Sequence, residues 1–557
     1  MVSNKNKYLY KTILFKMRIT SMKIYLIIIL WSLFGSTYII AQDKENSDTY
    51  WSHLDLNEDS IPGISLNKAY NRLLKNKKPK NSVIVGVLDT KLDYSHQDLR
   101  DNIWINNKEI PENNIDDDKN GYIDDVSGWN FLGNKNNEDL LYQHTAELRF
   151  VKRLEEKYKN KSKDDFQNKE ELKEYNTFKK TNDIYQEELN EIRARQRTFD
   201  SITNIYFKGK DTLKFYFKNK DYSVSDVDSL LVKNPPLERY FFLVKLVLQD
   251  KVTEEDIASQ ATFYNTQLDF ILNKNYDERI LIGDNPLDIN DRFYGNAIID
   301  GDVPFQHATS VAGILGASRK NDIGIKGITD NLKIMPVVMV SSGDEFDKDI
   351  AIAIRYAVDN GAKVINMSWG KHFSSHSNWV KDAFSYAQRK DVLLVTAAGN
   401  DNDNIDNIDY YPIDYNENNK EFVNNLIVVG ASTMDTNKLK ASFSCYGKNN
   451  VDLFAPGEKI YTTDVNNSYK YARGTSLASP IVSGVAALIR SYYPSLTASE
   501  VKQILMDSAV RYDTLVNLPT KEDPDRKVPF SSLSKSGGIV NAYNALLMAE
   551  KVVKDKK

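Results

Sequence analysis

The 557-residue sequence contains a single cysteine, Cys445, so it cannot form an intrachain disulfide. A large excess of charge is also missing, because 73 Lys and Arg residues oppose 77 Asp and Glu residues. The resulting charge of −4 provides no polyanion-attracting surface and argues against nucleic acid as a partner. Hydrophobic residues make up 41% of the chain, which excludes disorder throughout. Any extra stabilisation must therefore come from packing or from bound metal.

Beyond residue 41 the sequence lacks an apolar run long enough to span a membrane. The first 41 residues carry Lys16, Arg18 and Lys23 ahead of the apolar run Ile24–Phe34, and the small residue Ala41 precedes a charged stretch. This layout is typical of a secretory signal peptide. The alternative is a retained membrane anchor. We expect cleavage, an extracytoplasmic location (periplasmic or secreted) and no stable membrane span afterwards.

Short, almost continuously apolar runs recur along the rest of the chain, as expected of strands that are buried on both faces. They are Val83–Leu88, Ile334–Val340, Val364–Met367, Val392–Ala397 and Leu426–Gly430. Between and after them, apolar residues at spacings of three and four predict crossover helices. These segments are Asp349–Val358, Trp379–Arg389 and Ile481–Tyr492. The sequence therefore predicts an α/β fold with an open, doubly wound parallel sheet and helices on both faces.

A block rich in Lys, Glu, Asn and Tyr interrupts this pattern from Leu141 to Asn296. Its charge spacing predicts exposed helices. We interpret it as an inserted, mostly helical subdomain, and the alternative is a solvated excursion without a role of its own. The predicted organisation is a signal peptide (1–41), a short N-terminal extension (42–80), a main domain (81–140 and 297–550), the charged helical insertion (141–296) and a basic tail (551–557).

Three residues carry the candidate chemistry. Asp89 ends a predicted buried strand, where open α/β sheets place reactive groups, and His307 and Ser476 begin small-residue helical segments. Each alone is more typical of a structural role: a turn-capping Asp, a structural His, an N-cap Ser. Together they supply the carboxylate, base and nucleophile that acyl transfer needs. Their chain order is Asp, His, Ser, which excludes the α/β-hydrolase and chymotrypsin orders.

The motifs around these residues resemble the subtilisin-like serine proteases (subtilases). Gly474–Pro480 reads Gly-Thr-Ser-Leu-Ala-Ser-Pro, the serine motif of that family with Leu in place of Met. His307–Gly313 corresponds to His-Gly-Thr-His-Val-Ala-Gly, with Ala308 and Ser310 as departures. Val87–Thr90 is similar to the aspartate segment, in which Lys91 replaces a glycine, so that local backbone strain is expected there.

The resemblance implies further site residues. Asn400, in Ala-Ala-Gly-Asn, would donate to the oxyanion, and Ser368, Trp369 and Gly370 would pair with an extended substrate. It implies a secreted serine endopeptidase with Asp89, His307 and Ser476 as catalytic triad, acting on polypeptides through an acyl-enzyme. The alternative is a weak or inactive relative that uses the insertion to bind a partner.

An acidic loop follows the first strand, Asp116–Asp125. Side-chain oxygens fall at positions 1, 3, 5 and 9 of this loop, with Gly121 at position 6. This spacing is typical of a loop that folds around Ca²⁺. The expected ligands are Asp116, Asp118, Asn120, the Tyr122 carbonyl and Asp124, and Asp125 is a substitute because position 12 is not Glu. A solvated acidic loop is the alternative, and the calcium use common in subtilases favours a structural Ca²⁺.

Overall fold

The computed structural model describes residues 49–233, 238–301, 306–416, 420–520 and 523–556. The expected signal peptide lies outside these ranges. The described residues divide into two compact units, a larger one of residues 49–191 and 266–556 and a smaller one of residues 192–265. Every helix within the described ranges is too short or too polar to cross a membrane.

In the described part of the chain, the larger unit contains a nine-stranded sheet in the order β10-β13-β7-β6-β5-β4-β1-β3-β2. Neighbouring strands are parallel except for the antiparallel pair β10 and β13. The strands are β1 Val83–Asp89, β2 Trp129–Asn130, β3 Leu332–Val338, β4 Val364–Met367, β5 Leu393–Ala397, β6 Leu426–Ser432, β7 Leu453–Pro456, β10 Val510–Arg511 and β13 Gly538–Ile539. Two separate antiparallel pairs are β8 Ile460–Asp464 with β9 Ser468–Ala472, and β11 Leu515–Asn517 with β12 Lys527–Pro529.

The helices of this unit connect and cover the strands. They are α2 Leu56–Asp59, α3 Leu66–Lys68, α4 Ala146–Tyr158, α9 His307–Gly316, α10 Asp347–Asp359, α11 Ser377–Arg389, α12 Thr475–Tyr492, α13 Ala498–Asp507 and α14 Ala542–Asp555. Short 3-10 turns are η1 Trp51–His53, η3 Arg100–Asn102, η4 Lys163–Asp165 and η7 Phe530–Ser532, and η2 Ala69–Leu74 and η6 Gln267–Ile271 are π-helical.

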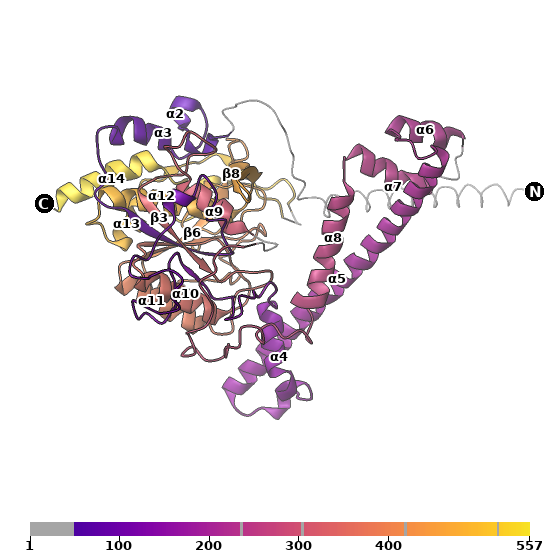
Figure 1. The fold of residues 1–557 in the computed structure, drawn as a ribbon, viewed down its shortest axis with the longest axis horizontal. Coiled ribbons are helices and arrows are strands. Elements are labelled where there is room, and N and C mark those ends of the chain that lie inside the picture. Colours follow the sequence, from indigo (N-terminus) through magenta and orange to yellow (C-terminus); the bar gives the residue numbers. More distant parts are fainter. Residues whose placement is uncertain (1–48, 234–237, 302–305, 417–419, 521–522, 557) are drawn as a thin grey trace, which may run out of the picture. The chain divides into compact units, whose positions relative to one another are not determined.

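The sheet is covered on both faces by hydrophobic clusters, because successive strand residues point to opposite sides. In β1, Val85 and Val87 belong to the cluster that includes α9 and α12. Leu88 belongs to the cluster on the other face, with α10 and α11. In Figure 1 these helix pairs lie on opposite sides of the strands. The predicted doubly wound α/β fold is therefore confirmed, with one antiparallel edge strand added.

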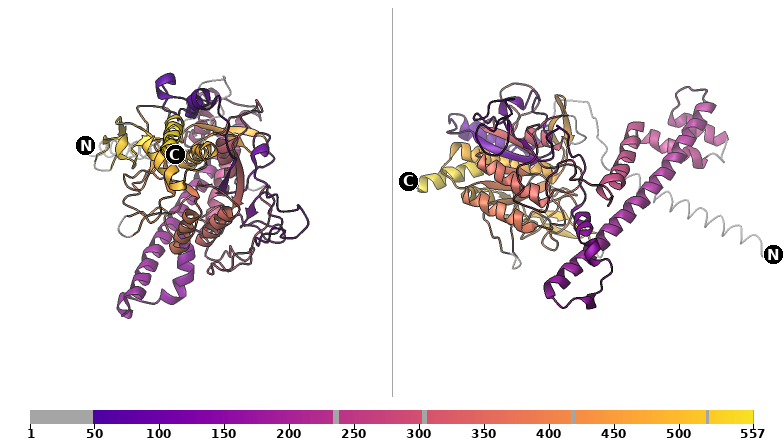
Figure 2. Two further views of the ribbon diagram at one scale, coloured as in Figure 1. Left: turned by 90° about the vertical axis from the view of Figure 1, so that its left-hand side faces the viewer. Right: turned by 60° about the horizontal axis from the view of Figure 1, so that its bottom comes forward.

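The smaller unit has a hydrophobic cluster of its own. Helix α5 (Lys169–Tyr216) begins in the larger unit and continues into the smaller one, which also holds α6 Val224–Lys233, α7 Glu238–Gln249 and most of α8 Glu254–Thr266. Phe199, Val227, Phe241 and Tyr264 pack together there. The Gln196 side chain of α5 donates to that of Asn265 in α8 over 3.0 Å. In the right view of Figure 2, α5 is the long magenta helix. This segment is thus more than an exposed set of charged helices.

Candidate active site

Asp89 and His307 meet at the carboxyl edge of the sheet. Asp89 is the last residue of β1 and is 1% exposed, and His307 is the first residue of α9. The imidazole Nδ1 lies 3.0 Å from each carboxylate oxygen of Asp89. A second contact fixes the two elements, since Thr90 Oγ1 accepts the backbone N–H of Ala308 over 3.0 Å. The carboxylate therefore holds one ring nitrogen and leaves Nε2 for other chemistry.

The pKa of His307 reflects two opposing effects. Burial lowers the pKa of the imidazole, but the charge of Asp89 and its hydrogen bond outweigh burial. The pKa consequently lies above the ordinary value of 6.5. An imidazole next to such a carboxylate accepts a proton readily, as a general base must.

Lys91 shows no sign of the strain that the sequence suggests. Its backbone is not among the described residues with positive φ. Its side chain is buried and pairs with Asp139 over 2.7 Å while donating to the carbonyl of Asp300 over 3.0 Å. The expectation of strain at this position is therefore wrong, because the turn uses a conformation open to any residue.

Ser476 stands in the first turn of α12. Gly474 precedes this helix with φ +148°, and a Cβ there would lie 2.8 Å from Ser476 Oγ, so glycine is needed beside the hydroxyl. Ser476 is partly exposed, and its backbone carbonyl accepts from Ser368 Oγ over 2.8 Å. Among the described residues, no hydrogen bond joins Ser476 Oγ to His307.

Asn400 lies beside the start of α12. Its side-chain oxygen accepts from the N–H of Thr475 over 2.9 Å and from the Thr475 hydroxyl over 3.0 Å. The side-chain oxygen is thereby occupied, and the amide N–H₂ remains to donate. The amide nitrogen lies 3.8 Å from the Cβ position of Gly474. Asn400 is exposed, so a substrate can reach this residue.

Ser368, Trp369 and Gly370 follow the end of β4. Trp369 Nε1 donates to the Leu88 carbonyl over 2.9 Å, and this bond ties the segment to β1. Ser368 Oγ also accepts from Asn366 over 2.8 Å. In the part of the chain that the structure describes, neither the N–H nor the carbonyl of Gly370 has a backbone partner. The segment thus offers a free main-chain edge.

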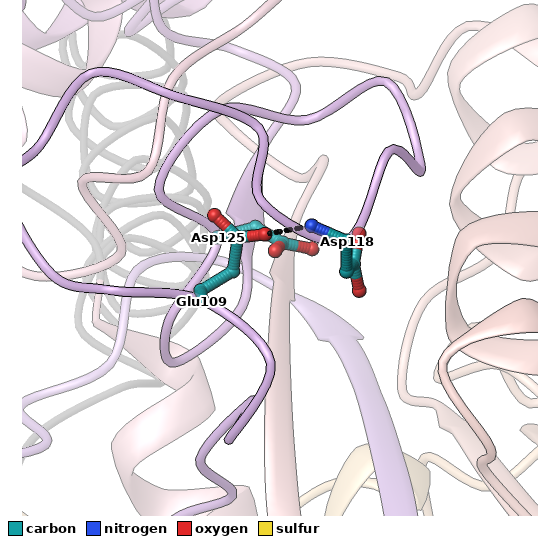
Figure 3. A group of neighbouring side chains, drawn as sticks. All are labelled: Glu109, Asp118 and Asp125. Atoms are coloured by element: carbon teal, nitrogen blue, oxygen red, sulfur yellow. Dashed lines mark hydrogen bonds between the residues drawn. The ribbon is translucent and has the colours of Figure 1, made fainter.

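The acidic loop brings together a set of carboxylates different from the predicted one. Glu109, Asp118 and Asp125 have oxygens within 4.8 Å of one another (Figure 3). The Asp118 N–H donates to Glu109 Oε1 over 2.9 Å, whereas the buried Glu109 Oε2 has no hydrogen-bond partner. Asp125 is buried and accepts from Asn106 and Tyr356. Sequence spacing missed Glu109, which precedes the loop.

The other expected ligands hold the loop itself. Asp116 accepts the backbone N–H groups of Asn120 and Gly121, and Asn120 Oδ1 accepts that of Tyr122. Asp124 accepts from the N–H groups of two residues upstream, Asn113 and Asn114. Asp118, from the five predicted ligands, and Asp125, the predicted substitute, join the carboxylate cluster found among the described residues.

Comparisons with known proteins show which sequences and structures the chain is similar to. Residues 293–537 match the model of the subtilase family. The chain is 38% identical over 205 residues to subtilisin DY of Bacillus licheniformis, which covers 36% of this chain and 70% of that protein. It is 38% identical over 204 residues to thermitase of Thermoactinomyces vulgaris, over 36% and 67% of the two chains. A solved structure of a Pseudoalteromonas arctica protease is 30% identical over 44% and 71%, with a TM-score of 0.35.

The family match, together with the similarity to subtilisin DY and thermitase, identifies a subtilisin-like serine endopeptidase. The chain belongs to the subtilase family. The family match begins at residue 293, so His307, Asn400 and Ser476 lie inside it and Asp89 lies outside.

Proposed function

We propose that this protein is a secreted endopeptidase that cleaves polypeptides with Asp89, His307 and Ser476 as its catalytic triad. The pairing of His307 Nδ1 with both oxygens of Asp89 at 3.0 Å is the observation that carries the proposal. That pairing selects the tautomer with Nε2 free to accept a proton. The leader-like pattern of residues 1–41 supports an extracytoplasmic location.

In the proposed mechanism, Ser476 Oγ attacks the carbonyl carbon of the substrate while His307 Nε2 takes the hydroxyl proton. The amide of Asn400 and backbone N–H groups at the start of α12 stabilise the developing oxyanion. His307 then returns the proton to the leaving amine, and an acyl-enzyme forms on Ser476. Water, deprotonated by the same imidazole, hydrolyses the ester and restores the serine. Throughout, Asp89 stabilises the imidazolium.

The substrate would lie extended along Ser368–Gly370. The free N–H and carbonyl of Gly370 can form antiparallel β-pairing with a peptide main chain, which binds without requiring a particular sequence. Ser368 links this segment to the nucleophile, since its hydroxyl donates to the Ser476 carbonyl over 2.8 Å. This hydrogen bond thereby fixes the position of the substrate-pairing segment relative to the nucleophile.

We further propose that the acidic loop holds a structural Ca²⁺. Carboxylate oxygens are the ligands that this hard cation prefers, and the unpaired Glu109 Oε2 is a donor in need of a partner. Glu109, Asp118 and Asp125 would supply it, with the remaining ligands from the loop. The ion would lower the repulsion among these carboxylates and stabilise the fold.

The triad is tested by casein cleavage. Ser476→Ala and His307→Ala should each abolish cleavage while the melting temperature stays within a few degrees of the parent, since each variant removes one reacting group of a cooperative unit. Ser532→Ala, at an exposed serine of η7, is the matched control and should retain full activity. Substantial cleavage by either triad variant would contradict the assignment.

A further inference from the structure

Two glycines leave a gap beside the proposed reaction centre. Gly370 lies just beyond β4 and Gly399 just beyond β5, which are neighbouring parallel strands. Their carboxyl ends therefore open on the same edge of the sheet. Gly399 immediately precedes Asn400, the proposed oxyanion donor, and its φ of +106° favours glycine. Neither position contributes a side chain to this space.

The ring of Tyr410 occupies the gap. A Cβ at Gly370 would lie 2.5 Å from Cε1, 2.8 Å from Cζ and 2.9 Å from the hydroxyl oxygen of Tyr410. A Cβ at Gly399 would lie 2.8 Å from the same Cζ and 3.0 Å from the same Cε1. One edge of a single ring thus lies against both glycines. A side chain at either position would clash with the ring.

The backbone holds this ring in place. Tyr411, the next residue, donates to the Lys371 carbonyl over 2.8 Å, and the Lys371 N–H donates back to the Tyr411 carbonyl over 3.0 Å. His372 adds an edge-on aromatic contact to Tyr410, with ring centroids 5.1 Å apart. The residues that flank Gly370 and Tyr410 are therefore paired to one another. These contacts hold the Tyr410 ring in a fixed position beside the two glycines.

A substrate bound as proposed would place one of its side chains against the Tyr410 ring. A peptide that pairs with the free main chain of Gly370 and presents its carbonyl to Ser476 and Asn400 has one side chain next to the cleaved bond. Successive side chains of an extended peptide point to opposite sides. The side chain that points toward the sheet at this position enters the gap between Gly370 and Gly399, where the Tyr410 ring already lies.

We propose that Tyr410 determines specificity by filling this subsite, so that the enzyme cleaves after small residues such as Gly, Ala and Ser and discriminates against Leu and Phe. This inference rests on the proposed function of Ser476 and Asn400. A mis-sized group in an apolar pocket changes kcat/KM by about 10- to 200-fold. The preference for Ala over Phe should therefore reach at least about tenfold.

Peptides that differ only in the residue before the cut test the inference, with Ala, Leu or Phe at that position. The parent enzyme should prefer Ala, and Tyr410→Ala should raise the Phe-to-Ala ratio of kcat/KM by about tenfold or more. Tyr410→Phe keeps the ring and should keep the parent order. Tyr216→Ala, at an exposed tyrosine of α5, is the control and should leave the ratio unchanged.

Two results would overturn the inference: a parent enzyme that cleaves after Phe as well as after Ala, or a ratio that stays constant in folded Tyr410→Ala. If Tyr410→Ala does not fold, Tyr410→Leu replaces it in the same assay. The sites at which the parent enzyme cuts casein are then a second test, and cuts mostly after large residues would contradict the inference. Failure of the proposed function has a different signature, namely cleavage that persists in Ser476→Ala or no cleavage of any peptide.

Discussion

At the scale of single residues, the protonation of His307 has a measurable consequence. Because its pKa is raised by Asp89, the imidazole should titrate above pH 6.5 in the folded protein. An NMR titration of the Ser476→Ala variant, with the signal assigned by His307→Gln, measures this midpoint. Asp89→Asn removes the charge and should lower the midpoint. A midpoint below 6.5, or one that Asp89→Asn does not move, would contradict the electrostatic role of Asp89.

The raised pKa also sets the pH dependence of cleavage. The base must be neutral to accept the serine proton, so kcat/KM should fall as the pH decreases through the pKa of His307 in the free enzyme. The acid limb should therefore have its midpoint above 6.5 and should coincide with the NMR value. A limb at clearly lower pH would assign the titrating base to another group.

Asn400 offers a second test at this scale. Removing one oxyanion donor from subtilisin costs about 10² to 10³ in kcat, and we expect the same order for Asn400→Ala. Because Asn400 also accepts from Thr475, the variant's melting temperature is the control for a structural effect. Asn407→Ala, at an exposed neighbour, should leave kcat unchanged. An unchanged kcat in folded Asn400→Ala would place the donor elsewhere.

The sequence could single out Asp89, His307 and Ser476 as candidates because each lies where an element with a clear apolar period begins or ends. The sequence analysis did not predict a role for Tyr410 or Glu109. Both lie in segments without periodicity. Tyr410 contacts Gly370 of another segment, and Glu109 meets Asp118 and Asp125 through the folding of the loop between them. Such contacts depend on the tertiary fold, which local residue spacing does not encode.

At the scale of elements, the acidic loop predicts a response to chelation. If Glu109, Asp118 and Asp125 bind one Ca²⁺, a chelator should lower the melting temperature, because the ion binds the folded state preferentially. Asp118→Ala and the isosteric Glu109→Gln should each abolish the chelator-dependent difference. Glu112→Gln, at an exposed acid nearby, should retain it. Equal melting curves of the parent with and without chelator would leave a solvated acidic loop.

The buried strands were the elements that the sequence predicted best. Val364–Met367 has the predicted bounds, and the other central strands differ by a few residues at their ends. The N-terminal extension was less predictable. Trp51, Ile64 and Leu66 lie in the same hydrophobic cluster as α12, although their spacing has no helical or strand period. Their burial follows from packing against distant helices.

At the scale of the whole molecule, the hydrophobic cluster of residues 192–265 suggests that this unit can be removed. Gln196 and Asn265 are hydrogen-bonded, so a short Gly-Ser linker can join residues 191 and 266. The trimmed enzyme should fold and cleave short peptides within about twofold of the parent, because residues 192–265 have a hydrophobic cluster of their own and supply none of the proposed site residues. Residues 141–191 must stay, since Gln143 pairs with Ser342 and His144 with Glu278.

The same variant tests whether the insertion restricts substrate entry, a hypothesis that follows from its position between Asp89 and His307 in the sequence. If it does, the rate on folded proteins relative to short peptides should rise in the trimmed enzyme. An unchanged ratio in a folded, active variant would contradict the hypothesis that the insertion restricts substrate entry. The insertion would then be better explained as a docking surface or as a segment without a role of its own.

The central claim is that Ser476 is an activated nucleophile, which separates an enzyme from an inactive binding relative. Labelling with a fluorophosphonate probe, followed by peptide mapping, measures this directly. The parent should be labelled at Ser476, more slowly below the pKa of His307, and Ser476→Ala should not be labelled. A folded parent that resists the probe, or a Ser476→Ala variant that is labelled equally, would contradict the account.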